Sequence, residues 1–155
     1  NPQAYALERA KNFGVPAFTF NHHDFTKTDE VLKQVQQFEP DLIVLAGFLW
    51  LVPQNFLKAF PNKIINIHPA LLPKFGGKGM HGANVHKAVV EAKEAESGIT
   101  IHYINEEYDK GDVILQHRCP VLPADTPDDV AARVLKLEHE FLPKVIEAIL
   151  LPKAG

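Results

Sequence analysis

Residues 64–75 read Ile-Ile-Asn-Ile-His-Pro-Ala-Leu-Leu-Pro-Lys-Phe, and this stretch organises the chain around it. Its apolar start is typical of a buried strand, and Pro69 and Pro73 end that strand because proline interrupts both ladder and helix. Asn66 and His68 stand two residues apart, so their side chains project from one face. Ligands bind beyond the carboxyl ends of strands in open α/β sheets. The stretch therefore predicts a site that combines an amide with an imidazole.

The segments around this stretch alternate between strand and helix patterns, which predicts an α/β domain with a mostly parallel twisted sheet flanked by helices. Residues 21–28 are polar and are expected to be irregular. The final helix is expected to begin with a capping box at Thr126 and to kink at Pro143. The other predicted strands are 15–20, 41–46, 98–104 and 113–121, and the predicted helices are 1–13, 31–38, 53–60, 83–95 and 126–150.

Size and composition limit the classes of protein to which this sequence can belong. The 155 residues are interpreted as one domain, 1–155, and the net charge of −3 disfavours a nucleic-acid partner. Cys119 is the only cysteine, and no apolar run has the length of a membrane span. These features predict a cytoplasmic protein that binds neither nucleic acid nor membrane.

The chain opens on a helix pattern where a doubly wound fold usually has a strand and a phosphate-binding turn. We therefore expect the domain to be amino-terminally incomplete and to lack its first βα unit. The alternative is a domain that simply starts on a helix.

Two further patterns suggest other chemistries. None of the eight histidines forms a His-Glu-x-x-His run, and paired cysteines are absent, so no metal site is expected. Residues 77–82 match the Gly-x-Gly-x-x-Gly string of dinucleotide loops. They do not directly follow a strand, so a surface loop before a helix is the favoured interpretation.

Asp109 is the third member of the candidate site. If the strand at 98–104 runs parallel to the strand at 64–67, the turn that carries Asp109 emerges at the same edge as His68. A nearby carboxylate raises the pKa of an imidazole, which suits His68 as a general acid, while Asn66 would stabilise an oxyanion. The residues alone leave another interpretation open, in which Asn66 is a strand-end polar group and Asp109 a turn former.

At these positions the sequence resembles the folate-dependent formyltransferases. The resemblance rests on Asn66-Ile-His68-Pro-Ala-Leu-Leu-Pro-Lys-Phe75 and on Gly98-Ile-Thr-Ile-His-Tyr-Ile-Asn-Glu-Glu-Tyr-Asp109-Lys-Gly111, with shorter blocks elsewhere, including one that ends at Gln116. It implies a Rossmann-like formyltransferase fold. It also implies transfer of a formyl group from 10-formyltetrahydrofolate to the amine of 5'-phosphoribosylglycinamide, in the biosynthesis of the purine nucleotide IMP.

The same resemblance assigns roles to residues. The family's catalytic residues fall on Asn66, His68 and Asp109. His102 and Thr100 would hold these residues in position without contacting the substrate. Glu138 would contact the acceptor. The folate would lie between two loops, contacting Leu49, Trp50, Leu51 and Val52 on one and Ile104, Asn105 and Glu106 on the other. Trp50 stands where better-known members carry arginine.

Some features depart from the family and leave alternatives. The loop at 74–85 is longer than in familiar relatives by about five residues, and without the first βα unit we expect the chain to bind the acceptor phosphate poorly and to be inactive. The alternatives are formyltetrahydrofolate deformylase, another formyltransferase that uses the same donor, such as one acting on methionyl-tRNA, a nicotinamide-dependent oxidoreductase and a non-catalytic binding module. The expected assembly is a monomer or a homodimer.

Overall fold

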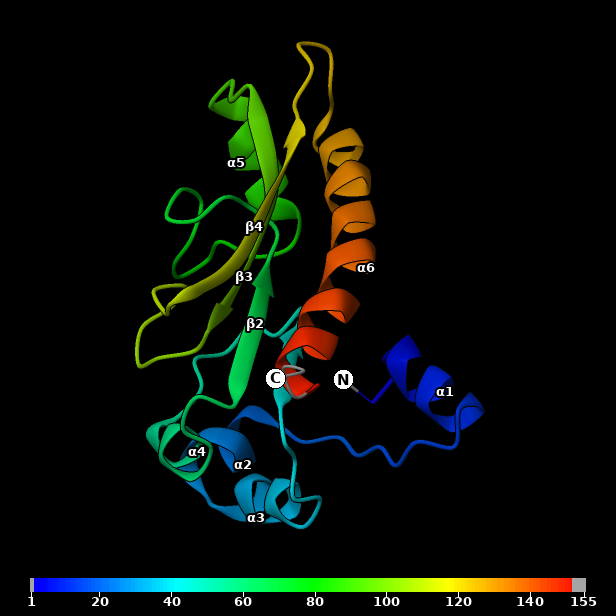
Figure 1. Ribbon diagram of the computed structural model, residues 1–155, viewed down its shortest axis with the longest axis vertical. Helices are drawn as coiled ribbons and strands as arrows, with labels where there is room; N and C mark the ends of the chain where they lie inside the picture. The colour runs from blue at the N-terminus through cyan, green and yellow to red at the C-terminus, as the bar shows by residue number, and fades with distance from the viewer. Residues whose placement is uncertain (1, 152–155) are drawn as a thin grey trace. The chain divides into compact units, whose positions relative to one another are not determined.

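The structure is a computed structural model that describes residues 2–151 (Figure 1). The chain divides into two compact units, Asn1–Pro40 and Asp41–Gly155. All the candidate site residues belong to the second unit.

The first unit contains three helices: α1 (Tyr5–Asn12), α2 (His22–Lys27) and α3 (Glu30–Gln36). The predicted strand at 15–20 is wrong, because this segment forms no ladder in the described part of the chain. Its phenylalanines pack on other rings instead, with Phe18 stacked on Phe38 at 6.3 Å and Phe20 on Phe25 at 5.4 Å.

The helix boundaries of this unit also differ from the prediction. Residues 21–28 are not irregular, because Asn21 caps α2 by accepting a hydrogen bond from the Asp24 backbone N–H. The first helix begins at Tyr5, and the predicted cap Asn1 lies outside the described residues.

The second unit is built on a four-stranded sheet in the order β1-β2-β3-β4. Its strands are β1 (Ile43–Ala46), β2 (Ile64–His68), β3 (Glu96–Tyr103) and β4 (Val113–Pro120). The pair β1–β2 is parallel, whereas β2–β3 and β3–β4 are antiparallel. The α/β class is confirmed, but a mostly parallel sheet is wrong for the strands described. Residues 104–112 join β3 to β4, and this connection is shorter than the roughly a dozen residues that a parallel crossover needs.

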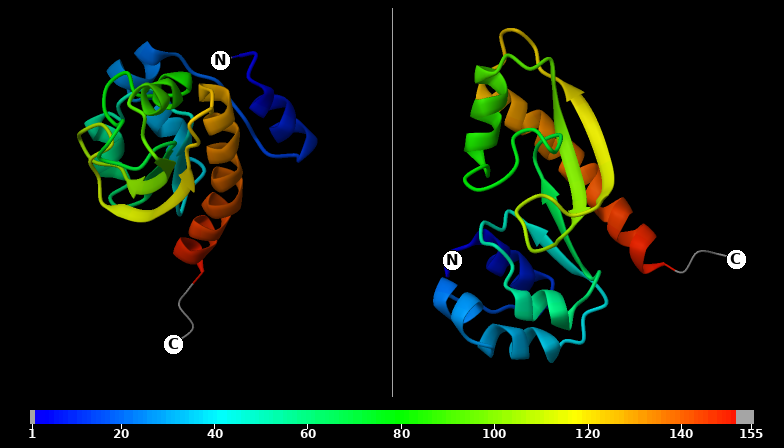
Figure 2. Two further views of the ribbon diagram at one scale, coloured as in Figure 1. Left: turned by 90° about the horizontal axis from the view of Figure 1, so that it is seen from above. Right: turned by 90° about the vertical axis from the view of Figure 1, so that its left-hand side faces the viewer.

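One face of the sheet carries the hydrophobic core. Alternate residues of β2 and β3, including Ile65, Ile99 and Ile101, are fully buried. They cluster with Val89 of α5 (Ala83–Glu91) and with valines of α6 (Pro127–Leu150), which runs alongside β3 and β4 (Figure 1; Figure 2 gives two further views). The short helix α4 (Gln54–Ala59) lies between β1 and β2 in the chain.

Helix α6 begins as expected. Thr126 and Asp129 form the predicted capping box, and Pro143 lies inside the helix, which continues to Leu150. Within residues 2–151, no helix has both the length and the apolar composition needed to span a membrane.

The opposite face of the sheet is polar around the strand centres. The register pairs Asn66 with His102, His68 with Thr100, and Thr100 with Gln116. Residues paired across neighbouring strands project from the same face, so these five side chains lie together on the polar face of the sheet.

Candidate active site

The structure brings the three predicted catalytic residues together. The Asp109 Oδ2 atom lies 3.7 Å from His68 Nδ1, and its Oδ1 atom lies 3.5 Å from His102 Nε2. Asn66 Nδ2 lies 3.3 Å from the same His102 nitrogen. His102 therefore joins the amide and the carboxylate, and the four side chains form one cluster on the polar face.

The strand direction that brings Asp109 close to His68 differs from the prediction. Because β3 is antiparallel to β2, its last residues lie beside the start of β2, and Asp109 reaches His68 only because the turn after β3 folds back. The Tyr103 N–H donates to the Asp112 carbonyl at the base of this turn. A Cβ atom on Gly111 would lie 1.7 Å from the Tyr103 carbonyl oxygen, so this closure requires glycine.

Asp109 itself has left-handed backbone geometry, with φ of 54°. Aspartate is among the few residues that adopt this conformation readily. The Gly77 N–H donates to its Oδ2 atom at 2.9 Å. The neighbouring Gly76 allows the close approach, since a Cβ atom there would lie 2.5 Å from Leu72 and 3.3 Å from the Asp109 Cβ atom.

The ionisation of His68 contradicts the prediction. Its ring is only 4% exposed, and burial lowers its pKa below the ordinary value, although Asp109 and the Phe75 carbonyl act in the opposite direction. The expected increase in pKa is therefore wrong. The resting imidazole of His68 is neutral around pH 7, which suits a proton acceptor better than a general acid.

The carboxyl of Asp109 is held in its charged form. Burial raises its pKa, but the contact with His102 and the hydrogen bond from the Gly77 backbone N–H outweigh burial and lower the pKa below its ordinary value. A fixed negative charge therefore stands beside a neutral imidazole, and it stabilises the imidazolium that forms when His68 accepts a proton.

Thr100 and His102, the predicted supporting residues, make hydrogen bonds around the cluster. The fully buried Thr100 hydroxyl donates to the Ala70 carbonyl at 2.7 Å and accepts from the Leu72 N–H at 3.0 Å. His102 donates from Nδ1 to its neighbouring Tyr103 carbonyl at 2.9 Å, which turns Nε2 towards Asn66 and Asp109.

Sequence reasoning missed three contributors to this cluster. The Phe75 carbonyl accepts from His68 Nε2 at 2.7 Å, Gly77 donates to Asp109, and Gln116 donates to both Leu72 and Thr100. Two of these are backbone groups, which leave no mark in a sequence. Gln116 does end one of the blocks that resemble the formyltransferases, and that position was the available signal.

The second predicted folate-binding loop is hydrogen-bonded to the start of α4, two residues after the first loop. Gln54, at the start of α4, donates to Glu106 at 3.2 Å. Leu49 and Leu51 are exposed and Val52 is buried, so the first loop presents apolar side chains at its surface. In the second loop, Ile104 is half-buried, Asn105 is exposed, and the Ile104 N–H donates to the Ile64 carbonyl.

Trp50 is half-buried and packs edge-on against Phe48, with ring centroids 5.8 Å apart. An exposed loop aromatic, the alternative interpretation, is therefore wrong.

Glu138 is half-buried on α6, outside the hydrogen-bonded cluster, and burial raises the pKa of its carboxyl. No group of three or more His, Cys, Asp or Glu side chains within residues 2–151 could hold a metal ion. The glycine string at 77–82 lies in the loop before α5, and its first N–H is used by Asp109. This contact disfavours a dinucleotide loop.

A family described as "Formyl transferase" matches residues 1–146. The chain belongs to the formyl transferase family. One relative is the chloroplastic phosphoribosylglycinamide formyltransferase of Arabidopsis thaliana, 43% identical over 92% of this chain and 50% of the relative. Another is the phosphoribosylglycinamide formyltransferase of Haemophilus influenzae, 37% identical over 93% of this chain and 68% of the relative.

Solved structures of formyl transferases share the fold. The phosphoribosylglycinamide formyltransferase of Streptococcus pneumoniae superposes with a TM-score of 0.86 at 34% identity, covering 97% of this chain and 83% of that one. This similarity confirms the predicted Rossmann-like α/β fold. The chain spans about half the length of the plant relatives it matches, 50% of one and 46% of the other.

Proposed function

We propose that this chain carries the catalytic residues for transfer of a formyl group from 10-formyltetrahydrofolate to the amine of 5'-phosphoribosylglycinamide. One observation carries the proposal: Asn66, His68 and Asp109 meet on one sheet face in a chain of the formyl transferase family. The relatives named phosphoribosylglycinamide formyltransferase support this acceptor. A Drosophila melanogaster relative is named a trifunctional purine biosynthetic protein, which supports a place in purine synthesis.

The reaction needs a stabilised oxyanion and a carrier for one proton. The acceptor amine attacks the formyl carbon, a C–N bond forms, and the carbonyl electron pair moves to oxygen. Asn66 donates a hydrogen bond to this oxyanion, because only one of its two amide protons faces His102. His68 takes the proton from the attacking nitrogen and returns it to the departing folate nitrogen as the second C–N bond breaks.

Asp109 makes that proton transfer favourable. Its charge lies 3.7 Å from the ring nitrogen that becomes protonated, so it stabilises the imidazolium in a site where His68 is 4% exposed. In our proposal, Asp109 also orders a water through which His68 exchanges this proton with the two substrate nitrogens.

The substrates are assigned to the two sides of this cluster. The donor's pterin ring lies between the loop of Leu49, Trp50, Leu51 and Val52 and the loop of Ile104, Asn105 and Glu106, and the Gln54–Glu106 hydrogen bond supports this placement. Trp50 contacts the donor through its ring, since an indole cannot supply the charge of an arginine. Glu138 accepts hydrogen bonds from the acceptor.

The two compact units belong, in this proposal, to one formyltransferase domain, which the family match over residues 1–146 supports. The single cysteine and the absence of a basic excess favour a cytoplasmic protein with small-molecule partners and no nucleic acid. The proposed assembly is a monomer or a homodimer, and no metal takes part.

A formyl-transfer assay tests the proposal. The purified protein is incubated with the donor, with and without 5'-phosphoribosylglycinamide, and the deformylated folate, formate and formylated acceptor are measured. Acceptor-dependent transfer supports the proposal. Formate release at the same rate with and without the acceptor would identify a deformylase. The absence of any folate turnover would reject both activities.

Donor binding can be followed separately. Trp50 is the only tryptophan in the sequence, so its fluorescence reports on the predicted donor loop. We expect quenching on titration with a folate and none with a nicotinamide dinucleotide. The opposite result would favour the oxidoreductase alternative.

A further inference from the structure

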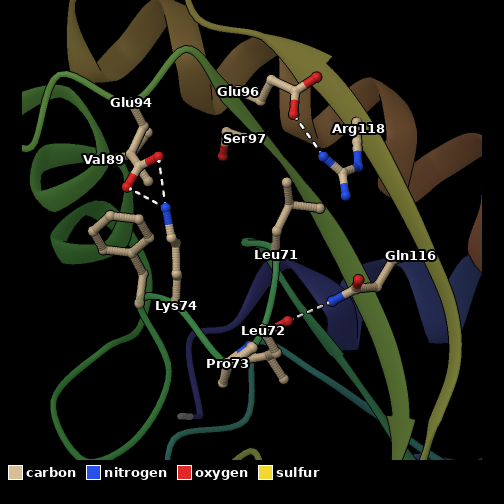
Figure 3. Close-up of a pocket in the computed structure, with 11 residues that line it drawn as sticks. Leu71, Leu72, Pro73, Lys74, Val89, Glu94, Glu96, Ser97, Gln116 and Arg118 are labelled. Atoms are coloured by element: carbon tan, nitrogen blue, oxygen red, sulfur yellow. Dashed lines mark hydrogen bonds and ion pairs between the residues drawn. The ribbon is translucent and has the colours of Figure 1, made fainter.

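The segment that follows His68, residues 69–75, is hydrogen-bonded to the buried hydroxyl of Thr100. Thr100 donates to the Ala70 carbonyl and accepts from the Leu72 N–H, so it holds the segment 69–75 on both sides of Leu71. Gln116 completes the attachment by donating to the Leu72 carbonyl at 2.8 Å and to the Thr100 hydroxyl at 2.9 Å. Figure 3 shows the Gln116 amide reaching Leu72 from the neighbouring strand.

Ala70 of this segment is fully buried and Phe75 packs against the core, but one side of the segment lacks packing. Its residues Leu71 to Phe75 line a cavity of about 240 Å³, whose far walls come from α5, β3 and β4 (Figure 3). A segment beside empty space has few neighbouring atoms to resist its movement on that side. On that side the segment is held by the hydrogen bonds of Thr100 and Gln116, together with the ion pair between Lys74 and Glu94.

Segment 69–75 ends at Phe75, whose backbone carbonyl contacts the His68 ring. A carbonyl oxygen can only accept a hydrogen bond, so the contact of 2.7 Å between the Phe75 carbonyl and His68 Nε2 requires a proton on Nε2. A neutral imidazole has one N–H, and the Nδ1 atom, which faces Asp109, is then left with a free electron pair.

We infer that Thr100 and Gln116 are positioning residues for the reaction, because they hold the Phe75 carbonyl where it keeps the proton of neutral His68 on Nε2. Nδ1 is thereby the nitrogen that takes the proton from the attacking amine and returns it to the folate nitrogen. This inference rests on the proposed function for its catalytic part. The tautomer of His68 is a property of the free protein and is tested without substrate.

The test compares Thr100→Val, which removes the hydroxyl at nearly constant shape, with Thr100→Ser, which keeps it. Long-range ¹H–¹⁵N spectra of the His68 ring, recorded where imidazoles are neutral, report which nitrogen carries the proton. We expect the parent and Thr100→Ser to hold the proton on Nε2 and Thr100→Val to show a mixture of tautomers.

The steady-state kinetics of formyl transfer are measured for the same variants. Displacement of a reacting group by an ångström costs about a hundredfold in rate, so kcat of Thr100→Val is expected to fall by about that factor, with KM for the acceptor changed by less than about twofold. Gln116→Met removes only the outer bonds, and we expect a fall in kcat of about tenfold. Thermal melting confirms that each variant is folded.

Arg118→Met is the matched control, since Arg118 lies two residues further along β4 and pairs with Glu96 instead of the segment. It is expected to change neither the tautomer nor kcat. The inference is overturned if folded Thr100→Val keeps the parent tautomer, or if Thr100→Ser loses as much rate as Thr100→Val. A parent protein that transfers no formyl group rejects the proposed function, and the tautomer comparison still decides the positioning role.

Discussion

Replacing Asp109 with asparagine isolates the contribution of its charge. Asparagine tolerates the left-handed backbone at this position, and its side-chain oxygen can still accept the Gly77 N–H. The change therefore leaves the turn in place and removes the charge that lies 3.7 Å from His68 Nδ1.

The size of the effect follows from Coulomb's law. At an effective dielectric constant of about 20, opposite unit charges at this separation interact with about 4 kcal/mol. Losing that stabilisation of the imidazolium lowers kcat by roughly a thousandfold. The affinity for the folate donor is expected to change little, because the proposed donor loops carry other residues.

The assay is steady-state formyl transfer at saturating substrates, with Trp50 fluorescence as the measure of donor binding. Glu107→Gln is the control, since Glu107 is an exposed carboxylate in the same turn that pairs with Lys110. The reasoning is refuted if Asp109→Asn retains a kcat near that of the control while remaining folded. Equal losses of kcat and of donor affinity would assign Asp109 to binding instead.

Three further predictions concern stability. Burial lowers the pKa of both His68 and His86, so below about pH 6.5 the unfolded chain binds more protons than the folded one. The free energy of unfolding should therefore rise with pH through that range in urea titrations, and His86→Leu should reduce the slope. Gly111→Ala should destabilise the fold by about 3 kcal/mol in the same titrations, because its Cβ atom would collide with the Tyr103 carbonyl; a wild-type stability would contradict the closed turn. Thr126→Ala should cost about 1 kcal/mol through loss of the α6 capping box, and an unchanged melting temperature would show that the cap contributes nothing.

Much of the site could be predicted from spacing along single strands. The two-residue interval between Asn66 and His68 places both side chains on one face in any strand, whatever its neighbours. The alternation of isoleucines with these polar residues likewise marks one face as core. Such patterns depend only on local backbone geometry, and the structure confirms them.

Other features required the packed structure. The segment at 15–20 has strand-like residues, but its phenylalanines pack on other rings and no ladder forms in the described part of the chain. The direction of β3 is decided by pairing with β2 and β4, and residues within one strand do not report it. For Asp109, the prediction that it meets His68 is confirmed, although the parallel strands expected to bring it there are absent.

The sequence by itself determined the strand that ends at His68, the polar pair it carries and the family resemblance through Asp109. Only the tertiary structure decided the charge state of the imidazole, because burial and a nearby carboxylate shift its pKa in opposite directions and their balance depends on how closely the chain covers the ring. It also decided which ring nitrogen holds the proton. That choice depends on a backbone carbonyl seven residues away, whose position is set by Thr100 and Gln116 on two other strands.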